Sequence, residues 1–366
     1  MLVLSPLLVE IGRDLDVSTG TAGQLRTLSG LVAGVTALLL GRVARRLPLR
    51  DLLRLGALLL TLASVLAAVA PSFAILALAQ LPTGIGLAIL VSAGVAGAAE
   101  WVPPGERARV LGWALAGQAV AWIVGMPLVG LLAEASWRLA FLVPLGASLL
   151  ALLVLALCAA GPRAAAPSTV SLFALLRDRV VAAWAVGELL AFSAWAGILV
   201  YAGALLIESY DASPTATGVV LGGVAAAYLP GNFLARRVVD RSSRALLITL
   251  ALAGSLGAAA VGLVRPALGA SVLILAVLGF IGGARTLAGS TFGLDAAPER
   301  KLAVTGVRAS ATQFGYLVGS LAGGAALAAG GYRALGLVFA ALYAAAAVPH
   351  VWLALTGRAA RSPATL

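Results

Sequence analysis

Residues 55–99 read LGALLLTLASVLAAVAPSFAILALAQLPTGIGLAILVSAGVAGAA and contain no charged side chain. The stretch is broken once, by Pro71 and Ser72, a pair that favours a turn over a continued helix. A helix of about 20 apolar residues spans the hydrocarbon layer of a bilayer. Each piece beside the break is close to that length, so the stretch predicts two transmembrane helices joined by a tight turn.

The rest of the chain has the same character. Of its 366 residues, 61% are hydrophobic and 11% are charged, whereas a soluble domain is about a quarter charged. Further uncharged runs of membrane-spanning length are Val110–Ala133, Leu139–Pro162, Ala212–Ala235, Ala245–Val264, Pro266–Ala284, Ala309–Tyr332 and Ala334–Gly357. The sequence therefore predicts an all-α membrane protein.

The spacing of these runs predicts about twelve helices. They are 1–13, 20–42, 51–70, 73–98, 108–133, 138–160, 180–206, 215–235, 245–264, 268–292, 304–328 and 333–356. The first is too short to cross about 30 Å of hydrocarbon at 1.5 Å per residue. We expect this helix to be incomplete, through either a misplaced start or a truncation.

The two halves of the chain repeat one another. Aligned pairs of residues include Gln118 with Gln313, Gly84 with Gly279, and Glu100 with Asp295. The repeat divides the chain into a helical half at 1–160, a cytoplasmic linker at 161–179 and a second helical half at 180–366. Parallel repeats of this kind are related by an axis along the membrane normal, which predicts two six-helix bundles.

The charges predict the orientation. Most of the 25 basic residues fall in the connections on one side of the predicted membrane, and Arg308 is counted with them. Basic connections remain cytoplasmic, so we expect the C-terminus in the cytoplasm and the chain in the cell inner (plasma) membrane. The net charge of +11 then favours anionic lipid as a partner and not nucleic acid.

Few residue types suited to catalysis are present. The chain has one lysine, Lys301, one cysteine, Cys158, and one histidine, His350. Lys301 follows no glycine-rich phosphate loop, and a lone histidine makes neither a hydrolase triad nor a metal site. The sequence predicts no enzymatic activity, no cofactor and no metal.

Two cytoplasmic connections resemble loop motifs of the major facilitator superfamily, within it the twelve-helix drug/proton antiporters and sugar-efflux permeases. The first reads GRVARRLPLR from Gly41 and keeps that glycine and the basic Arg46 and Arg50. The second-half copy reads DRSSR and supplies Asp240, Arg241 and Arg244. The resemblance covers the whole chain and implies that these loops set the balance between conformations, with a solvated basic loop as the alternative.

The fifth predicted helix resembles the Gly-Pro motif of exporters in this family. It contains Gly117, Gly125, Pro127 and Gly130. Glycine lets helices approach closely and proline removes a backbone hydrogen bond. The motif therefore predicts a functional bend and favours export, with plain helix packing as the alternative. Gln80 stands where many members have an arginine tied to proton coupling, so the resemblance does not by itself imply proton antiport.

A transporter needs polar groups inside the membrane that face a cavity, because such groups are costly elsewhere. Gln118 and Gln313 occupy equivalent positions in the two halves, so they predict either a substrate clasp or a polar contact within each half. Aromatic side chains that could line an apolar cavity, or serve only in packing, are Trp122, Phe192, Trp195, Phe314 and Tyr316.

Glu188 and Arg285 are predicted to form an ion pair between the seventh and tenth helices. Each lies about eight residues from the cytoplasmic end of its helix, or roughly 12 Å deep. An unpaired charge at that depth is expensive. The pair is either a permanent structural bridge or one that opens to let Glu188 take a proton.

These features together predict a monomeric secondary transporter that works by alternating access. The first hypothesis is export of a small, largely apolar compound, driven by proton antiport. Facilitated or ion-coupled uptake of a metabolite is the alternative, and a non-transporting receptor or defective remnant is the third.

Overall fold

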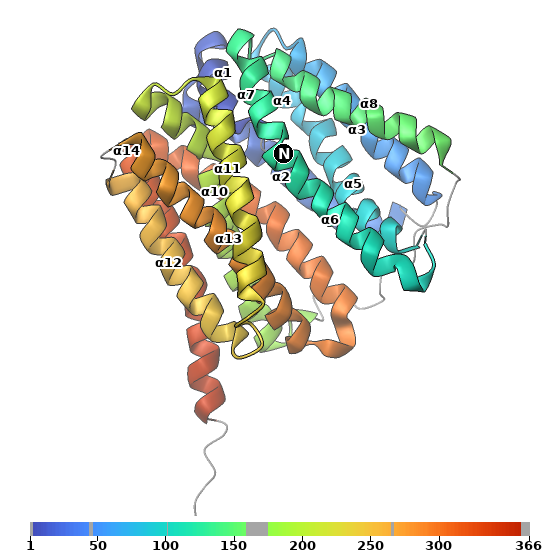
Figure 1. Ribbon diagram of the computed structural model, residues 1–366, viewed down its shortest axis with the longest axis vertical. Helices are drawn as coiled ribbons and strands as arrows, with labels where there is room; N and C mark the ends of the chain where they lie inside the picture. The colour runs from blue at the N-terminus through green and yellow to red at the C-terminus, as the bar shows by residue number, and fades with distance from the viewer. Residues whose placement is uncertain (1–2, 44–46, 101, 159–174, 265–266, 360–366) are drawn as a thin grey trace, which may run out of the picture. The chain divides into compact units, whose positions relative to one another are not determined.

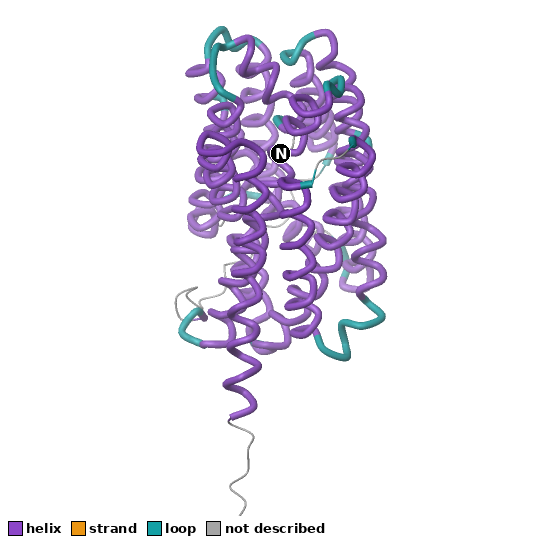
Figure 2. Tube along the Cα trace, turned by 90° about the vertical axis from the view of Figure 1, so that its left-hand side faces the viewer, coloured by secondary structure: helices purple, strands orange, loops and turns teal. Residues whose placement is uncertain are grey.

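The computed structural model describes residues 3–43, 47–100, 102–158, 175–264 and 267–359. Every regular element within these ranges is helical (Figure 2). The predicted linker therefore lies largely outside the described residues.

The first eleven helical elements correspond to the first six predicted helices, and their order can be followed by colour in Figure 1. They are η1 (Ser5–Leu7), α1 (Leu8–Asp14), α2 (Thr19–Val43), α3 (Leu49–Ala68), α4 (Phe73–Leu78), α5 (Gln80–Glu100), η3 (Pro104–Glu106), α6 (Arg107–Ile123), α7 (Gly125–Ala135), η4 (Leu139–Phe141) and α8 (Leu142–Leu157). Helix α3 packs against α5 and α8, and α5 packs against α2.

The remaining elements correspond to the last six predicted helices. They are α10 (Arg179–Tyr210), α11 (Pro214–Ala235), α12 (Ser243–Leu263), α13 (Leu268–Ala296), η5 (Pro298–Arg300) and α14 (Lys301–Ala359). Helix α14 contains two residues with non-helical backbone angles, Gly330 and Gly331, at the boundary predicted between residues 328 and 333. Helix α12 packs against α13 and α14.

Two helices predicted as continuous each carry a local irregularity. Helices α4 and α5 meet at Ala79, and α6 and α7 meet at Val124, and both residues keep helical backbone angles. Pro82 and Pro127 lie three residues after these positions and have no backbone N–H, so the carbonyls four residues before them lose their helical donor. Ser72, in the predicted turn, caps α4 by accepting a hydrogen bond from the backbone N–H of Ile75.

The chain divides into two compact units. One contains Met1–Pro167 together with Leu199–Ala225, and the other contains Ser168–Ile198 together with Ala226–Leu366. The first unit therefore includes the C-terminal part of α10 and the N-terminal part of α11, which belong to the second half of the sequence.

Polar contacts attach these segments to the first unit. The Ser5 hydroxyl donates to the carbonyl of Leu199 at 2.6 Å, and the backbone N–H of Gly203 donates to Ser5 Oγ at 3.3 Å. On α11, both the hydroxyl and the N–H of Thr215 donate to Glu134, at 2.8 and 3.1 Å. The C-terminal part of α10 and the start of α11 thus complete the packing of this unit.

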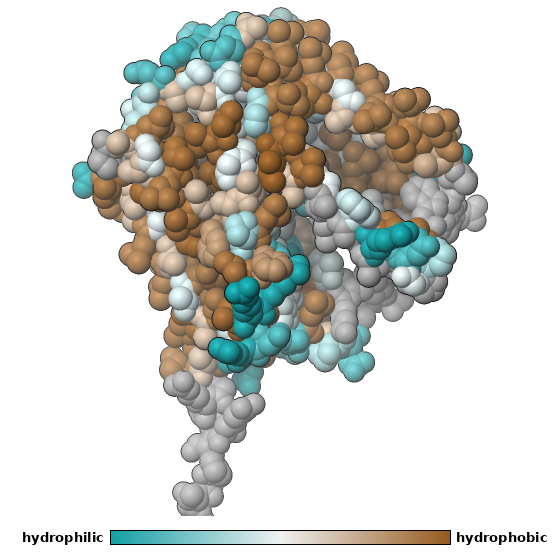
Figure 3. Space-filling model, in the orientation of Figure 1, coloured by the Kyte–Doolittle hydropathy of each residue, from teal (hydrophilic) through white to brown (hydrophobic). Residues whose placement is uncertain are grey.

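The surfaces of the helices fit a lipid environment. Nine helical segments of the described chain are long and apolar enough to cross a membrane. Helix α8 exposes a stripe of large apolar side chains, namely Leu149, Leu150, Leu153, Val154 and Leu157, and hydrophobic residues cover much of the face in Figure 3. By contrast, most side chains along α10 are buried.

A polar cluster joins the end of α1 to the turn before η4. Asp14 accepts hydrogen bonds from Arg138 Nη1 at 2.7 Å and from Trp137 Nε1 at 3.1 Å. Arg138 also donates to the carbonyl of Ala70 at 3.0 Å. The hydrogen bond from Arg138, followed by that from Trp137, lowers the pKa of the Asp14 carboxyl below its ordinary value.

We expect Asp14→Asn to cause a small fall in melting temperature near neutral pH, since exposed ion pairs contribute little. A lowered pKa means that the stabilisation is present above the ordinary carboxyl pKa and is lost as the pH falls through the lowered value. Melting curves of both proteins between neutral and strongly acidic pH should therefore converge in acid. Asp16→Asn, which changes an exposed carboxylate in the same loop, is the control; the same fall there would contradict a specific role for Asp14.

Candidate functional site

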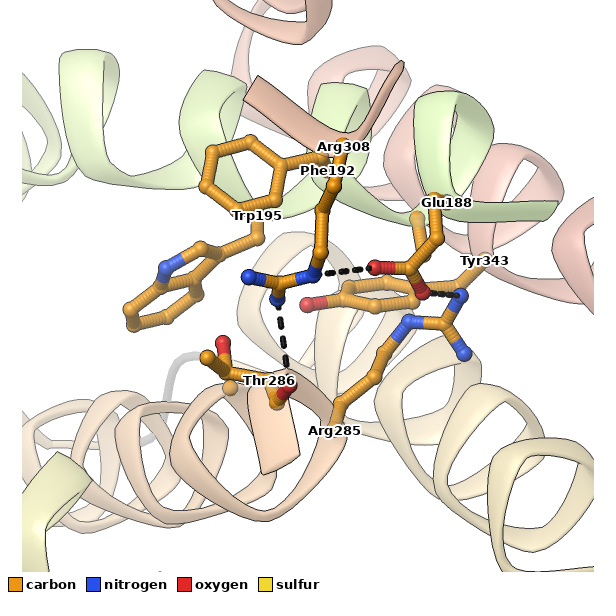
Figure 4. Close-up of a pocket in the computed structure, with 9 residues that line it drawn as sticks. Glu188, Phe192, Trp195, Arg285, Thr286, Arg308 and Tyr343 are labelled. Carbon is orange, nitrogen blue, oxygen red and sulfur yellow. Dashed lines mark hydrogen bonds and ion pairs between the residues drawn. The ribbon is translucent and has the colours of Figure 1, made fainter. Parts of the chain in front are cut away.

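A buried cluster of three charged side chains lies within the second unit (Figure 4). Glu188 on α10 accepts from Arg285 Nη2 on α13 at 3.2 Å and from Arg308 Nε on α14 at 3.3 Å. Each arginine uses a different carboxylate oxygen. The predicted pairing of Glu188 with Arg285 is therefore present, and a second arginine joins it.

Arg308 lies deeper in its helix than expected from the sequence, where it stands four residues into the predicted helix 304–328 and is counted with the basic residues of the cytoplasmic side. Helix α14 begins at Lys301, which places Arg308 about two turns inside the helix. The side chain of Arg308 is 22% exposed and those of Glu188 and Arg285 are 5% and 7% exposed. Had this helix been predicted to begin three residues earlier, at Lys301, Arg308 would stand about as deep as Glu188 and Arg285.

A glycine allows the cluster to form. A Cβ atom at Gly289 on α13 would lie 2.5 Å from Glu188 Oε1, so any side chain there would displace the carboxylate. The carbonyl of Gly289 also accepts a hydrogen bond from Trp184 Nε1 at 2.8 Å. Close approach of α10 to α13 at this glycine brings Glu188 within reach of both arginines.

The cluster forms one wall of a pocket. The lining residues are Glu188, Ala191, Phe192, Trp195, Gly282, Arg285, Thr286, Arg308 and Tyr343. The cavity between them is narrow. Its volume, counted as the space that the centre of a water molecule can occupy, is about 10 Å³, which is enough for about one water. A larger ligand would require the lining side chains or helices to move.

The other predicted cavity residues are distributed over both units. Gln118 on α6 is exposed and Trp122 is half-buried, whereas Gln313 on α14 is buried. These two glutamines belong to different units, so the substrate clasp stays a prediction.

Of the predicted aromatic residues, Trp195 lines the pocket. Tyr316 is buried and lies edge-on to Phe192, with ring centroids 6.0 Å apart. Phe314 is half-buried. Phe192, which also lines the pocket, is therefore held by an aromatic neighbour outside the lining.

The loop residues predicted to influence gating have varied surroundings. Arg50 Nη1 donates to the carbonyl of Cys158 at 3.1 Å, and Arg244 Nη1 donates to the carbonyl of Leu353 at 3.4 Å. Asp240 and Arg241 are exposed. Gly41 lies in α2, and Arg46 is outside the described residues. Their role in gating stays a prediction.

The four residues of the predicted bend motif differ in their contacts. Helices α6 and α7 meet at Val124, between Gly117 and Pro127, where the backbone angles stay helical. A Cβ at Gly218 of α11 would lie 3.0 Å from the Cα of Gly130, so Gly130 serves close helix packing. A Cβ at Gly117 or Gly125 would meet nothing within 4 Å. Packing therefore explains Gly130, and the functional bend stays a prediction.

The described residues contain no group of three or more His, Cys, Asp or Glu side chains placed to hold a metal ion. The candidate site is instead an ion cluster beside aromatic rings.

Comparison with known proteins agrees with this architecture. The family model described as Major Facilitator Superfamily matches residues 1–203 and 184–365. The chain is 28% identical to the "Transcription regulatory protein OpdE" of Pseudomonas aeruginosa, over 93% of this chain and 86% of that protein. It is 29% identical to the "Inner membrane transport protein YdhP" of Escherichia coli, over 64% of this chain and 61% of that protein.

Shorter and structural similarities point the same way. A "Chloramphenicol efflux pump" of Mycobacterium tuberculosis is 32% identical, over 38% of this chain and 34% of the pump. The crystal structure of a mutant of the nucleoside transporter NupG matches with a TM-score of 0.80 at 14% identity, over 96% of this chain and 95% of that one. With the family model matching both halves, the chain belongs to the Major Facilitator Superfamily and is a multi-pass membrane transporter, not an enzyme.

Proposed function

We propose that the protein exports a small, largely apolar compound across the cell inner membrane by proton antiport. It acts as a monomer with its C-terminus in the cytoplasm. The proposal rests above all on one feature, the Glu188 carboxylate held between Arg285 and Arg308.

The cluster has the chemistry that proton coupling requires. The negative charge of Glu188 holds α10 to α13 and α14 through two ion pairs. A proton on the carboxylate would remove that charge and weaken both contacts at once, since hydrogen bonds between charged groups are roughly twice as strong as neutral ones. Proton binding would thereby favour a conformation in which these helices move apart.

Direction and location have separate support. The Gly-Pro motif resembles that of exporters, and one relative is named as an efflux pump. Another relative is named as an inner membrane transport protein. The concentration of basic residues in connections on one side favours a cytoplasmic C-terminus.

The direct test is flux in liposomes. Purified protein is reconstituted with a pH-sensitive dye inside, and chloramphenicol and a set of small aromatic compounds are added with and without an imposed pH gradient. We expect at least one compound to cross the membrane in one direction while protons cross in the other. Protein-free liposomes are the control. Proton movement in the same direction as the compound would favour uptake, flux indifferent to the gradient would contradict antiport, and no flux would favour a receptor or remnant.

A further inference from the structure

The pocket in the second unit has an excess of positive charge. Among its described lining residues there are two guanidinium groups, Arg285 and Arg308, and one carboxylate, Glu188. Both carboxylate oxygens are already engaged. One positive charge therefore remains uncompensated among the described lining residues, in an apolar helical environment where such a charge is costly.

The two arginines are not equivalent. Arg285 is enclosed and donates to the carbonyls of Gly187 and Leu247, at 2.9 and 3.4 Å, in addition to Glu188. Arg308 is the more exposed of the two. Its Nη2 donates to the carbonyl of Thr286 at 3.1 Å, and its other terminal nitrogen points toward Trp195 (Figure 4). Arg308 is thus the arginine that presents its charge to the pocket.

A second donor faces the same space. The hydroxyl of Tyr343 points into the pocket in the direction of the Arg308 guanidinium (Figure 4). Tyr343 is fully buried, and its hydroxyl has no hydrogen-bond partner among the described residues. A buried hydroxyl without a partner is destabilising, so its orientation beside a cation indicates a site for an acceptor that carries negative charge.

The opposite wall is aromatic. Phe192 and Trp195 project from α10 into the pocket. Flat rings suit the apolar body of a ligand, whereas the narrow space beside Arg308 and Tyr343 suits its acidic group. The described lining can therefore bind one acidic group of a ligand. It has no free carboxylate for a cationic group, because Glu188 pairs with both arginines.

From these contacts we infer that the pocket, when its lining side chains move apart to admit a ligand, binds an organic monoanion, an aromatic carboxylate or similar acid, with its charged group on Arg308 and Tyr343 and its ring against Phe192 and Trp195. This inference rests on the proposed function, because it names the class of compound that the transporter would carry. It specifies that the small, largely apolar substrate carries a single acidic group.

The test is direct binding, which does not depend on transport. Purified protein in detergent is titrated calorimetrically with benzoate and with benzamide, which has nearly the same shape and no charge; protein-free detergent is the blank. Hydrogen bonds to charged groups are worth about 1.5–3 kcal/mol, so we expect benzoate to bind about tenfold or more tightly than benzamide. Arg308→Gln should remove that preference, and Tyr343→Phe should reduce it severalfold.

Arg300→Gln, which removes the same charge from an exposed position on η5, should leave the preference unchanged. If Arg308→Gln fails to fold, Tyr343→Phe still decides the matter, because it removes one oxygen only. Equal binding of the two compounds, or no measurable binding of benzoate, would overturn the inference. Preferential benzoate binding without flux of any compound would refute the proposed transport but support the anion site. Proton-coupled flux with equal binding of benzoate and benzamide would support the proposed transport but refute the anion site.

Discussion

Glu188→Gln is expected to abolish accumulation driven by a pH gradient while downhill exchange of the same compound persists. Glutamine has nearly the shape of glutamate but cannot bind or release a proton in this range. The transporter would therefore be fixed in the neutral state of the cluster, with both contacts to Arg285 and Arg308 weakened. The measurement is the ratio of internal to external compound in liposomes at steady state, which should fall to one.

The control for this substitution is Asp295→Asn, which removes an exposed carboxylate from the end of α13. It should keep gradient-driven accumulation. Glu188→Gln protein must also elute as a single species and melt cooperatively before its flux is interpreted. Unimpaired accumulation by a folded Glu188→Gln protein would rule out Glu188 as the proton site, and loss of folded protein would mean that the cluster is structural.

Arg285→Met is expected to have the largest effect on folding. Arg285 donates to Glu188 and to the carbonyls of Gly187 and Leu247, and its side chain is 7% exposed. Methionine would fill much of the space but would leave both carbonyls without this donor. Breaking a buried ion pair by removing one partner typically costs about 3–5 kcal/mol, so the melting temperature in detergent should fall sharply.

Two comparisons make this result interpretable. Arg308→Met removes a more exposed guanidinium and should destabilise the protein less. The double variant Glu188→Gln with Arg285→Met removes the buried carboxylate as well as the guanidinium, and it should recover part of the lost stability. A melting temperature for Arg285→Met equal to that of the unchanged protein would refute a structural role for this arginine.

The helices could be predicted from the sequence because apolar runs of membrane-spanning length leave few alternatives. The depth of Glu188 and Arg285 followed from counting residues along two helices that run in opposite directions, since rise per residue is constant. The irregularities at Ala79 and Val124 also had a visible cause in Pro82 and Pro127, and both helices are continuous spans, as predicted.

Other parts of the site could not be predicted because they depend on rotation about the helix axis. Periodicity is weak where a helix is apolar on all sides. Both Trp195 and Gln118 were named as cavity candidates, and periodicity did not separate Trp195, which lines the pocket, from Gln118, which is exposed in the other unit. The orientation of the Tyr343 hydroxyl depends on how α14 packs against α10 and α13, which sequence spacing alone does not determine.

The allocation of α10 and α11 between the two units has a consequence for biosynthesis. Leu199–Ala225 completes the unit that begins at Met1, through contacts such as those of Ser5 with Leu199 and Gly203. A ribosome delivers residues 1–167 before this segment exists, and domains of most proteins fold from the N-terminus as they emerge. The helices of residues 1–167 therefore lack part of their packing partner until the start of α11 has been translated. The first unit is thus completed only after synthesis of the second half has begun.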